Sequence, residues 1–127
     1  MKITTGIDVI DVDRIKQVIQ ESSDTFVQKV FTQDEIEYCN NAKAHKYESF
    51  AARFAAKEAV FKALDVQLDD NYVGWKDIEV INGQTGRPKV ELNGMFKKYY
   101  DNILNIDISL SHEKHIAIAS VSILWKD

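Results

Sequence analysis

This chain of 127 residues lacks the usual marks of secreted and membrane proteins. Cys39 is its only cysteine, so it cannot form an internal disulfide, and a reducing cytoplasm is the expected compartment. It has no long uncharged apolar run, and its first residues lack the apolar core of a signal peptide. We therefore expect a cytoplasmic protein with no membrane partner.

Acidic residues outnumber basic residues in this chain. The chain has 16 Lys and Arg against 20 Asp and Glu, which gives a formal net charge of −4. A general nucleic-acid-binding protein needs a basic surface, so we expect no nucleic-acid partner. This charge still allows a local basic patch for an acidic protein.

Several well-known catalytic motifs are missing as well. The sequence has no G-x-S-x-G nucleophile elbow, no P-loop and no dinucleotide-binding fingerprint. The single cysteine and the 3 histidines do not form a zinc-binding pattern. Any divalent metal would therefore depend on carboxylate oxygens.

The order of the expected elements predicts an α+β fold. Length and composition favour a single domain, residues 1–127, with a mainly antiparallel sheet packed against a long central helix and shorter helices. Expected strands are 2–9, 75–81, 89–92, 106–111 and 116–124, the last two as a hairpin. Expected helices are 15–19, 26–31, 33–40, 44–64 and 95–104. Residues 65–74 are expected to be a loop.

Two local signals mark helix starts. Asp11 or Asp13 is a candidate cap for the first helix, because a carboxylate accepts hydrogen bonds from free amides there. Thr32-Gln-Asp-Glu35 has the pattern of a capping box, which predicts a helix from Gln33.

The long helix is rich in alanine and contains neither glycine nor proline. Phe50, Phe54 and Phe61 recur at helical spacing and define an apolar face. Glu58 and Lys62 fall on one flank of that face. Arg53 and Lys57 fall on the other, and for Lys57 we expect a solvated helix edge.

Asp8 and Glu58 have two interpretations. Asp8 lies between Ile7 and Val9, so the alternation of a strand turns it to the opposite face. If Asp8 and Glu58 converge, their oxygens suit Mg²⁺ and leave positions for water and phosphate, with Lys62 one helical turn away. Alternatively, Asp8 ends a strand and Glu58 pairs with Lys62 on the helix surface, which is a common arrangement.

Five motifs occur in an order that resembles a known family. They are Gly6-Ile-Asp-Val, Phe31-Thr-x-x-Glu35, Arg53-Phe-Ala-Ala-Lys-Glu-Ala-x-x-Lys62, Gly86-Arg-Pro88 and Ser109-Leu-Ser-His112. Together they resemble the small bacterial holo-[acyl-carrier-protein] synthases of the 4′-phosphopantetheinyl transferase superfamily. The resemblance covers nearly the whole chain and favours the metal-site interpretation of Asp8 and Glu58.

The resemblance implies an enzyme of fatty acid biosynthesis. Such an enzyme moves 4′-phosphopantetheine from coenzyme A to a serine of apo-acyl carrier protein and releases 3′,5′-ADP. It implies Mg²⁺ bound by Asp8 and Glu58, phosphate contact by Lys62, and a homotrimer with each site between two subunits. The coenzyme A site would include Arg53, Phe54, Gly86, Arg87, Pro88, Ser109, Ser111 and His112. The serine proton would pass to Glu58 or to a water held by the metal.

The resemblance also implies a docking surface for the acidic helix of the carrier protein. Its members here would be Arg14, Phe26 and Lys29. Ser22, Ser23 and Thr25 occupy a stretch that is often richer in basic residues in the family, so docking would be weaker or rearranged. A second hypothesis is a non-catalytic trimeric module that binds acidic helices through Arg14 and Lys29 without binding coenzyme A.

Overall fold

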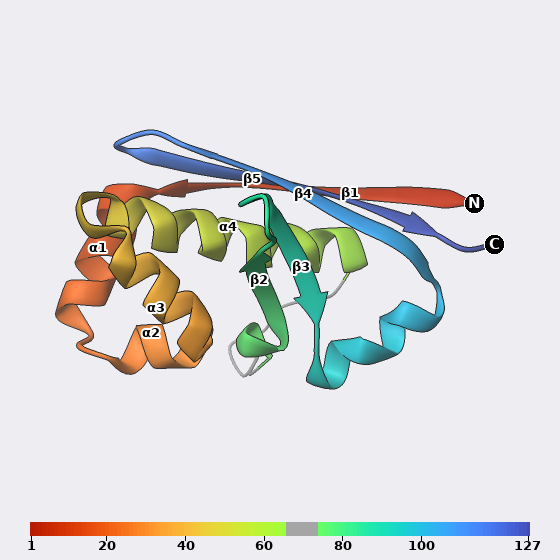
Figure 1. Cartoon of the computed structure of the whole chain (residues 1–127), viewed down its shortest axis with the longest axis horizontal. Helices are drawn as coiled ribbons and strands as arrows, with labels where there is room; N and C mark the ends of the chain where they lie inside the picture. Colours follow the sequence, from red (N-terminus) through yellow and green to blue (C-terminus); the bar gives the residue numbers. More distant parts are fainter. Residues whose placement is uncertain (66–73) are drawn as a thin grey trace.

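A long helix lies beneath a three-stranded sheet at the centre of the molecule. The computed structural model describes residues 1–65 and 74–127. Helix α4 (Lys46–Leu64) runs along one face of an antiparallel sheet of strand order β1-β5-β4 (Figure 1). The α+β fold and the C-terminal hairpin are therefore confirmed.

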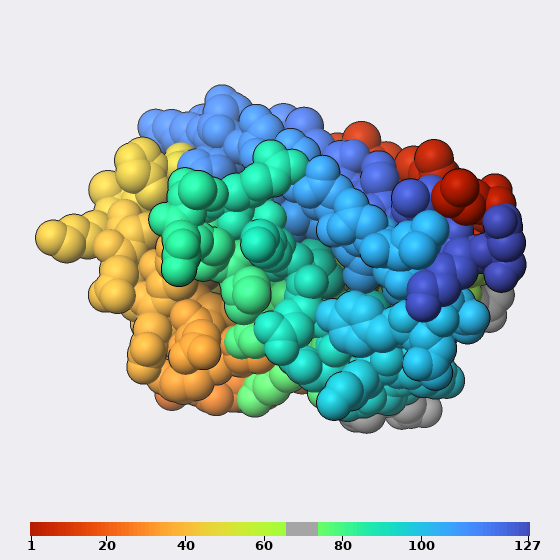
Figure 2. All heavy atoms as spheres, turned by 45° about the vertical axis from the view of Figure 1, so that its right-hand side comes forward, coloured from red at the N-terminus to blue at the C-terminus, as the bar shows by residue number. Residues whose placement is uncertain are grey.

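The other elements are arranged around α4. Before it come β1 (Lys2–Asp11), α1 (Val12–Glu21), α2 (Thr25–Val30), α3 (Gln33–Asn41) and η1 (Lys43–His45). After it come η2 (Trp75–Asp77), β2 (Ile78–Asn82), β3 (Pro88–Leu92), η3 (Gly94–Asp101), β4 (Ile103–His112) and β5 (Ile116–Trp125). Helices α1–α3 gather at one end of α4, and both termini lie at the other (Figure 1). The β2–β3 hairpin lies between these helices and the C-terminal strands (Figure 2).

The predicted helix starts are correct. The Asp11 side chain caps α1 by accepting a hydrogen bond from the Arg14 amide at 3.2 Å. Thr32 and Glu35 form both bonds of the capping box at the start of α3. The loop expected at 65–74 lies almost wholly outside the described residues.

Gly6 lets β1 approach α4 unusually closely. A Cβ atom added to Gly6 would lie 1.9 Å from the Ala59 carbonyl oxygen, so no other residue fits without a shift of the strand. Asp8, two residues along β1, also turns toward α4, whereas Ile7 and Val9 turn outward and are exposed. The close approach therefore brings the Asp8 carboxylate to the helix.

Two expected elements are wrong in part. Trp75–Asp77 form a turn of 3₁₀ helix, and the strand begins at Ile78, because Trp75 folds back to pack against Phe54 and Phe61. Residues Gly94–Asp101 also form 3₁₀ helix, and Ile103 begins β4. Ile103 is buried in the core and pairs with Trp125, which a helix over 95–104 would not allow.

Helix α4 is buried on most of its circumference, and this corrects the expectation for Lys57. Its side chain is fully buried and pairs with Glu35 at 2.9 Å, so it is no solvated edge. The helix contributes to both hydrophobic cores, one under the sheet and one among α1–α3. Within the described ranges, no helix is long and apolar enough to cross a membrane.

Candidate functional site

Asp8, Glu58 and Lys62 come together on one flank of α4, and we call them the carboxylate cluster. Lys62 Nζ donates to Asp8 Oδ1 at 3.1 Å and to the Ile7 carbonyl oxygen at 2.9 Å. The Asp8 side chain is only 11% exposed, and no N–H or hydroxyl group of the described residues donates a hydrogen bond to its buried Oδ2. Lys62 thus pairs with the strand carboxylate.

The environment of Glu58 disfavours its negative charge. Partial burial first, the adjoining charge of Asp8 second and a hydrogen bond between the two carboxyl groups third raise the pKa of Glu58 to about 7, against the opposing charge of Lys62. Near neutral pH this carboxyl lies midway between its two protonation states. The cluster therefore holds more negative charge than one lysine balances.

A hard cation fits this donor set. In the described ranges, no group of three or more His, Cys, Asp and Glu side chains is placed to hold a metal. Mg²⁺ does not need such a cage, because one or two carboxylates, water and substrate phosphate oxygens commonly complete its octahedron. The unpartnered Asp8 oxygen and the disfavoured charge of Glu58 are what such an ion would satisfy.

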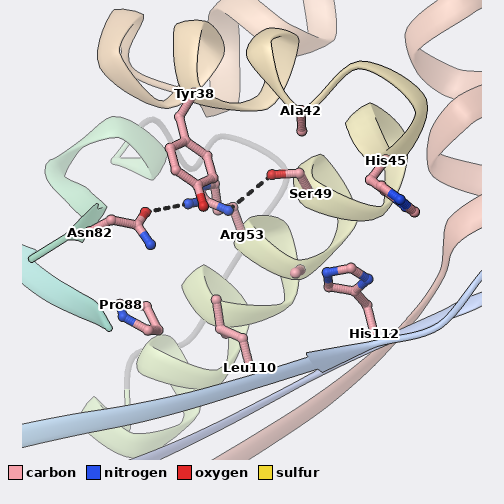
Figure 3. Close-up of a pocket in the computed structure, with 10 residues that line it drawn as sticks. Tyr38, Ala42, His45, Ser49, Arg53, Asn82, Pro88, Leu110 and His112 are labelled. Carbon is pink, nitrogen blue, oxygen red and sulfur yellow. Dashed lines mark hydrogen bonds between the residues drawn. The ribbon is translucent and has the colours of Figure 1, made fainter. Parts of the chain in front are cut away.

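A second group of predicted residues lines a cavity of about 230 Å³ on the other flank of α4, which we call the Arg53 cavity. It contains Arg53, Pro88 and His112 from the predicted coenzyme A site (Figure 3). His112 Nδ1 lies 3.2 Å from Glu48 Oε2, and His45 Nδ1 lies 2.8 Å from the same oxygen. Two imidazoles and a guanidinium thus face one small cavity.

The rest of the predicted coenzyme A residues lie outside this cavity. Gly86 forms the tip of the β2–β3 turn, where its φ of +83° favours glycine. Arg87 is exposed and makes two bonds to Asp107, at 2.9 and 3.0 Å. Ser109 and Ser111 are exposed on β4, on the strand face opposite to the half-buried Leu110 that lines the cavity.

Phe54 lies neither in the carboxylate cluster nor in the Arg53 cavity. It lines a groove of about 440 Å³ with Arg14 and Phe26, which we call the Arg14 groove, and its ring packs against Phe26 at 5.6 Å. The structure thus groups Phe54 with two predicted docking residues and not with Arg53. Lys29 is exposed on α2 and does not line this groove.

The carboxylate cluster and the Arg53 cavity are separated within one chain. Arg53 and Glu58 are five residues apart on α4, which turns their side chains about 140° from each other around the helix. Asp8 belongs to β1 at one edge of the sheet, whereas His112 belongs to β4 at the other edge. The two groups of predicted site residues are therefore not brought together in a single chain.

Sequence reasoning did not find Tyr38, Ser49 and Asn82, which surround Arg53. Asn82 and Gly83 form a pair typical of tight turns, which says nothing of a site, and Tyr38 and Ser49 belong to no recognisable pattern. Their role depends on contacts between α3, α4 and β2, which local patterns do not specify.

Comparison with known proteins places this architecture in one family. Residues 4–119 match the family model described as 4′-phosphopantetheinyl transferase superfamily. A holo-[acyl-carrier-protein] synthase of Ruminiclostridium cellulolyticum is 46% identical over 121 residues, which cover 94% of this chain and 90% of that protein.

Two solved structures share the fold over nearly their full length. The Helicobacter pylori holo-[acyl-carrier-protein] synthase in complex with coenzyme A has a TM-score of 0.81 and 28% identity, and covers 94% of this chain and 99% of that one. A holo-(acyl-carrier-protein) synthase of Bacillus anthracis with CoA (3′,5′-ADP) has a TM-score of 0.77 and 28% identity, and covers 98% and 96%.

Proposed function

Because this chain belongs to the 4′-phosphopantetheinyl transferase superfamily, and within it to the holo-[acyl-carrier-protein] synthases, we propose the reaction that it carries out. It transfers 4′-phosphopantetheine from coenzyme A to a serine of apo-acyl carrier protein and releases 3′,5′-ADP, in support of fatty acid biosynthesis. The observation that carries this proposal is the convergence of Asp8, Glu58 and Lys62. The substrates and the single buried thiol of Cys39 suit a cytoplasmic enzyme.

We propose that Asp8 and Glu58 hold Mg²⁺ together with the coenzyme A diphosphate. The ion would supply positive charge to the diphosphate oxygens. Support comes from the unpartnered Asp8 oxygen and from the raised pKa of Glu58, both of which a bound cation would relieve. Residues 1–127 would then act as one phosphopantetheinyl transferase domain.

The chemistry requires positioning and charge stabilisation more than a protein nucleophile. The carrier-protein serine oxygen attacks the phosphorus that bears pantetheine, and its proton would pass to Glu58 or to a water. The bond from that phosphorus to the bridging oxygen breaks, and that oxygen leaves with 3′,5′-ADP. Lys62 is 56% exposed, so its ammonium can reach a phosphate oxygen while it stays beside Asp8. Its charge stabilises the negative charge that develops in the transition state.

We further propose a homotrimer in which each site forms between two subunits. The carboxylate cluster and the Arg53 cavity lie on opposite flanks of α4. The cluster of one subunit can therefore face the cavity of its neighbour, and the two together would form one site. The outer sheet face offers an apolar surface for such contact. Its members, each at least 37% exposed, are Ile3, Ile7, Val9, Ile116 and Ile118. Val9 lies directly opposite Ile118 in the strand register, so the surface is continuous.

The Arg53 cavity and the Gly86-Arg87-Pro88 turn beside it are the proposed site for the nucleotide end of coenzyme A. Ser109 and Ser111 face away from the cavity of their own chain, and we propose that they meet the substrate near the subunit boundary.

The Arg14 groove is the proposed docking site for the acidic carrier protein. Arg14 supplies charge, and Phe26 and Phe54 supply an apolar floor. Lys29 adds a second cation on α2. Association should weaken as salt rises if these cations steer it. Salt-insensitive association would assign docking to the apolar floor.

Mass spectrometry tests the proposed reaction. Apo-acyl carrier protein is incubated with this protein, coenzyme A and Mg²⁺, and the expected result is a carrier-protein mass increased by one phosphopantetheine. An unchanged mass, with a known synthase active in parallel, would overturn the proposal and favour the non-catalytic docking module.

Co-expression tests the shared site. Glu58→Gln impairs the carboxylate cluster, and Arg53→Ala impairs the Arg53 cavity. When the two variants assemble at random in equal amounts, about one site in four combines an intact cluster with an intact cavity, so mixed trimers should recover roughly a quarter of wild-type activity. Native mass spectrometry confirms that mixed trimers have formed. If such trimers show no activity, the carboxylate cluster and the Arg53 cavity of one site belong to the same subunit.

A further inference from the structure

Arg53 is a buried cation without a counter-ion. The residue is only 4% exposed, yet no carboxylate in residues 1–65 and 74–127 lies within ion-pairing distance of it. Its hydrogen-bond partners are neutral: Nη1 donates to Ser49 Oγ at 3.1 Å and Nη2 donates to Asn82 Oδ1 at 2.6 Å. Lys57, one turn away on the same helix, is matched by Glu35.

Tyr38 closes one face of the guanidinium. The Arg53 Cζ atom lies 3.9 Å from the centroid of the Tyr38 ring, which is a close cation–π contact. Figure 3 shows Tyr38 reaching from α3 to the guanidinium, with Asn82 and Ser49 on either side. Tyr38 is 48% exposed, so it packs over Arg53 and adds little to the hydrophobic core.

An unpaired buried charge costs free energy, and neutral partners offset only part of that cost. The Arg53 Nε atom is buried and has no hydrogen-bond partner in the described ranges, so the guanidinium is not fully satisfied. An arrangement that fixes a cation at a cavity wall without neutralising it is suited to an anion that arrives from outside. The ligand expected there is an anion, and coenzyme A, the proposed substrate, offers phosphate groups.

We propose that Tyr38 and Asn82 are positioning residues that hold Arg53 uncompensated for a phosphate group of coenzyme A. This inference rests on the proposed function and extends it, because neither residue belongs to the motifs that identify the family. Tyr38 fixes the plane of the guanidinium, and Asn82 binds it without cancelling its charge. Both residues then set the affinity for coenzyme A and not the rate of the chemical step.

Two substitutions at Tyr38 test its part. Tyr38→Leu removes the ring face and should raise the KM for coenzyme A roughly tenfold, with little change in kcat. Tyr38→Phe keeps the ring and should leave KM within about twofold of wild type. Melting temperatures show whether the fold is retained, and the exposure of Tyr38 predicts small shifts. A wild-type KM in Tyr38→Leu, or a loss confined to kcat, would overturn its assignment.

Two substitutions at Asn82 test the missing counter-ion. Asn82→Asp and Asn82→Ala both lose the amide that donates to the Gly86 carbonyl oxygen at 2.9 Å, so their difference reports the added charge. The aspartate would pair with Arg53 and compete with substrate phosphate, and should raise KM at least about tenfold above the alanine variant. Equal KM values in the two variants would contradict the proposal.

Dephospho-coenzyme A, which lacks the 3′-phosphate, identifies the phosphate that Arg53 receives. If the Tyr38→Leu penalty in affinity measured by calorimetry disappears with this ligand, the 3′-phosphate binds Arg53. If the penalty persists, a diphosphate oxygen does. Both results support an anion site. An active wild type whose affinity is insensitive to all four variants would sink this inference alone, whereas an inactive wild type would sink the proposed function.

Discussion

Lys57 and Glu58 are neighbours in the chain but belong to opposite kinds of charged cluster. Lys57 Nζ contacts three oxygens, from Glu35 at 2.9 Å, Trp75 at 3.0 Å and Ile78 at 2.5 Å, and Lys57 and Glu35 are both fully buried. Glu58 lies half-buried beside a second carboxylate, and the only cation in its cluster is the exposed Lys62.

The two clusters also differ in how their oxygens are satisfied. Glu35 accepts from the Thr32 amide through Oε1 and from the Val80 amide through Oε2, both at 2.8 Å, so it ties α3 to β2. Asp8 Oδ2 receives no hydrogen bond from an N–H or hydroxyl group in the part of the chain that the structure describes. We call the Lys57–Glu35 cluster, whose charges and oxygens are satisfied, the closed cluster, and the carboxylate cluster of Asp8, Glu58 and Lys62 the open cluster. The closed cluster stabilises the fold, whereas the open cluster lowers stability and is available to a ligand. Such a contrast marks a functional site.

The largest effect should come from breaking the closed cluster. Lys57→Met leaves Glu35 buried without its cation and should lower the free energy of unfolding by about 3–5 kcal/mol. Denaturant unfolding followed by circular dichroism measures this loss. The double variant Glu35→Leu with Lys57→Met removes both charges and should recover part of the stability. A single variant as stable as wild type would show that the pair contributes nothing.

Breaking the open cluster should act on catalysis. Glu58→Gln keeps the shape and removes the charge that we assign to Mg²⁺, so transfer to the carrier protein should fall by roughly a hundredfold or more. Asp8→Asn should behave in the same way. Circular dichroism should show a native fold in both, and full activity in either would sink its assignment as a metal ligand.

The open cluster should also make stability depend on pH in the direction opposite to that of an ordinary ion-paired carboxylate, which loses its stabilising effect as pH falls. The pKa of Glu58 is about 7 in the folded protein, against 4.5 for an unperturbed glutamate. The folded state therefore binds this proton more tightly, and the stability it contributes is complete below about pH 4.5 and lost as pH rises through about 7. Without divalent metal, the melting temperature of Glu58→Gln should exceed that of wild type by an amount that grows with pH. A difference that is constant across this range would contradict the proposed environment of Glu58.

The smallest effect on stability should come from Lys62→Met. This lysine is exposed, so the loss of its bond to Asp8 should change the free energy of unfolding by less than about 1 kcal/mol. Transfer activity should nevertheless fall, because the cation for the phosphate is gone. The same substitution at Lys57 and at Lys62 thus separates structure from function, and equal loss of stability at both positions would remove the distinction.

Local signals account for much of the fold. The capping box at Thr32, the Ala-rich helix and the alternating strands of the C-terminal hairpin depend on near neighbours, and these predictions are correct. The helix expected over 95–104 is wrong in its type and at its end: residues Gly94–Asp101 form 3₁₀ helix, and Ile103 pairs with β5 through a long-range contact.

The candidate site was less accessible to sequence reasoning. Spacing placed Glu58 and Lys62 on one helical flank, but only the close approach of Gly6 to Ala59 brings Asp8 to them. Lys57 was misjudged because its partner Glu35 lies on another helix. Phe54 entered the predicted coenzyme A site with Arg53 through the family resemblance, and the structure places it in the Arg14 groove beside Phe26. Local spacing gives no sign of this difference, because it depends on the contact between α2 and α4.

Calorimetry of coenzyme A binding shows whether Glu58 holds Mg²⁺ together with the substrate. Coenzyme A is titrated into wild type and into Glu58→Gln, each with Mg²⁺ and with a chelator. We expect Mg²⁺ to strengthen binding to wild type and to leave the weaker binding to Glu58→Gln unchanged. If Mg²⁺ strengthens binding equally in both proteins, Glu58 does not hold the metal and the account is contradicted.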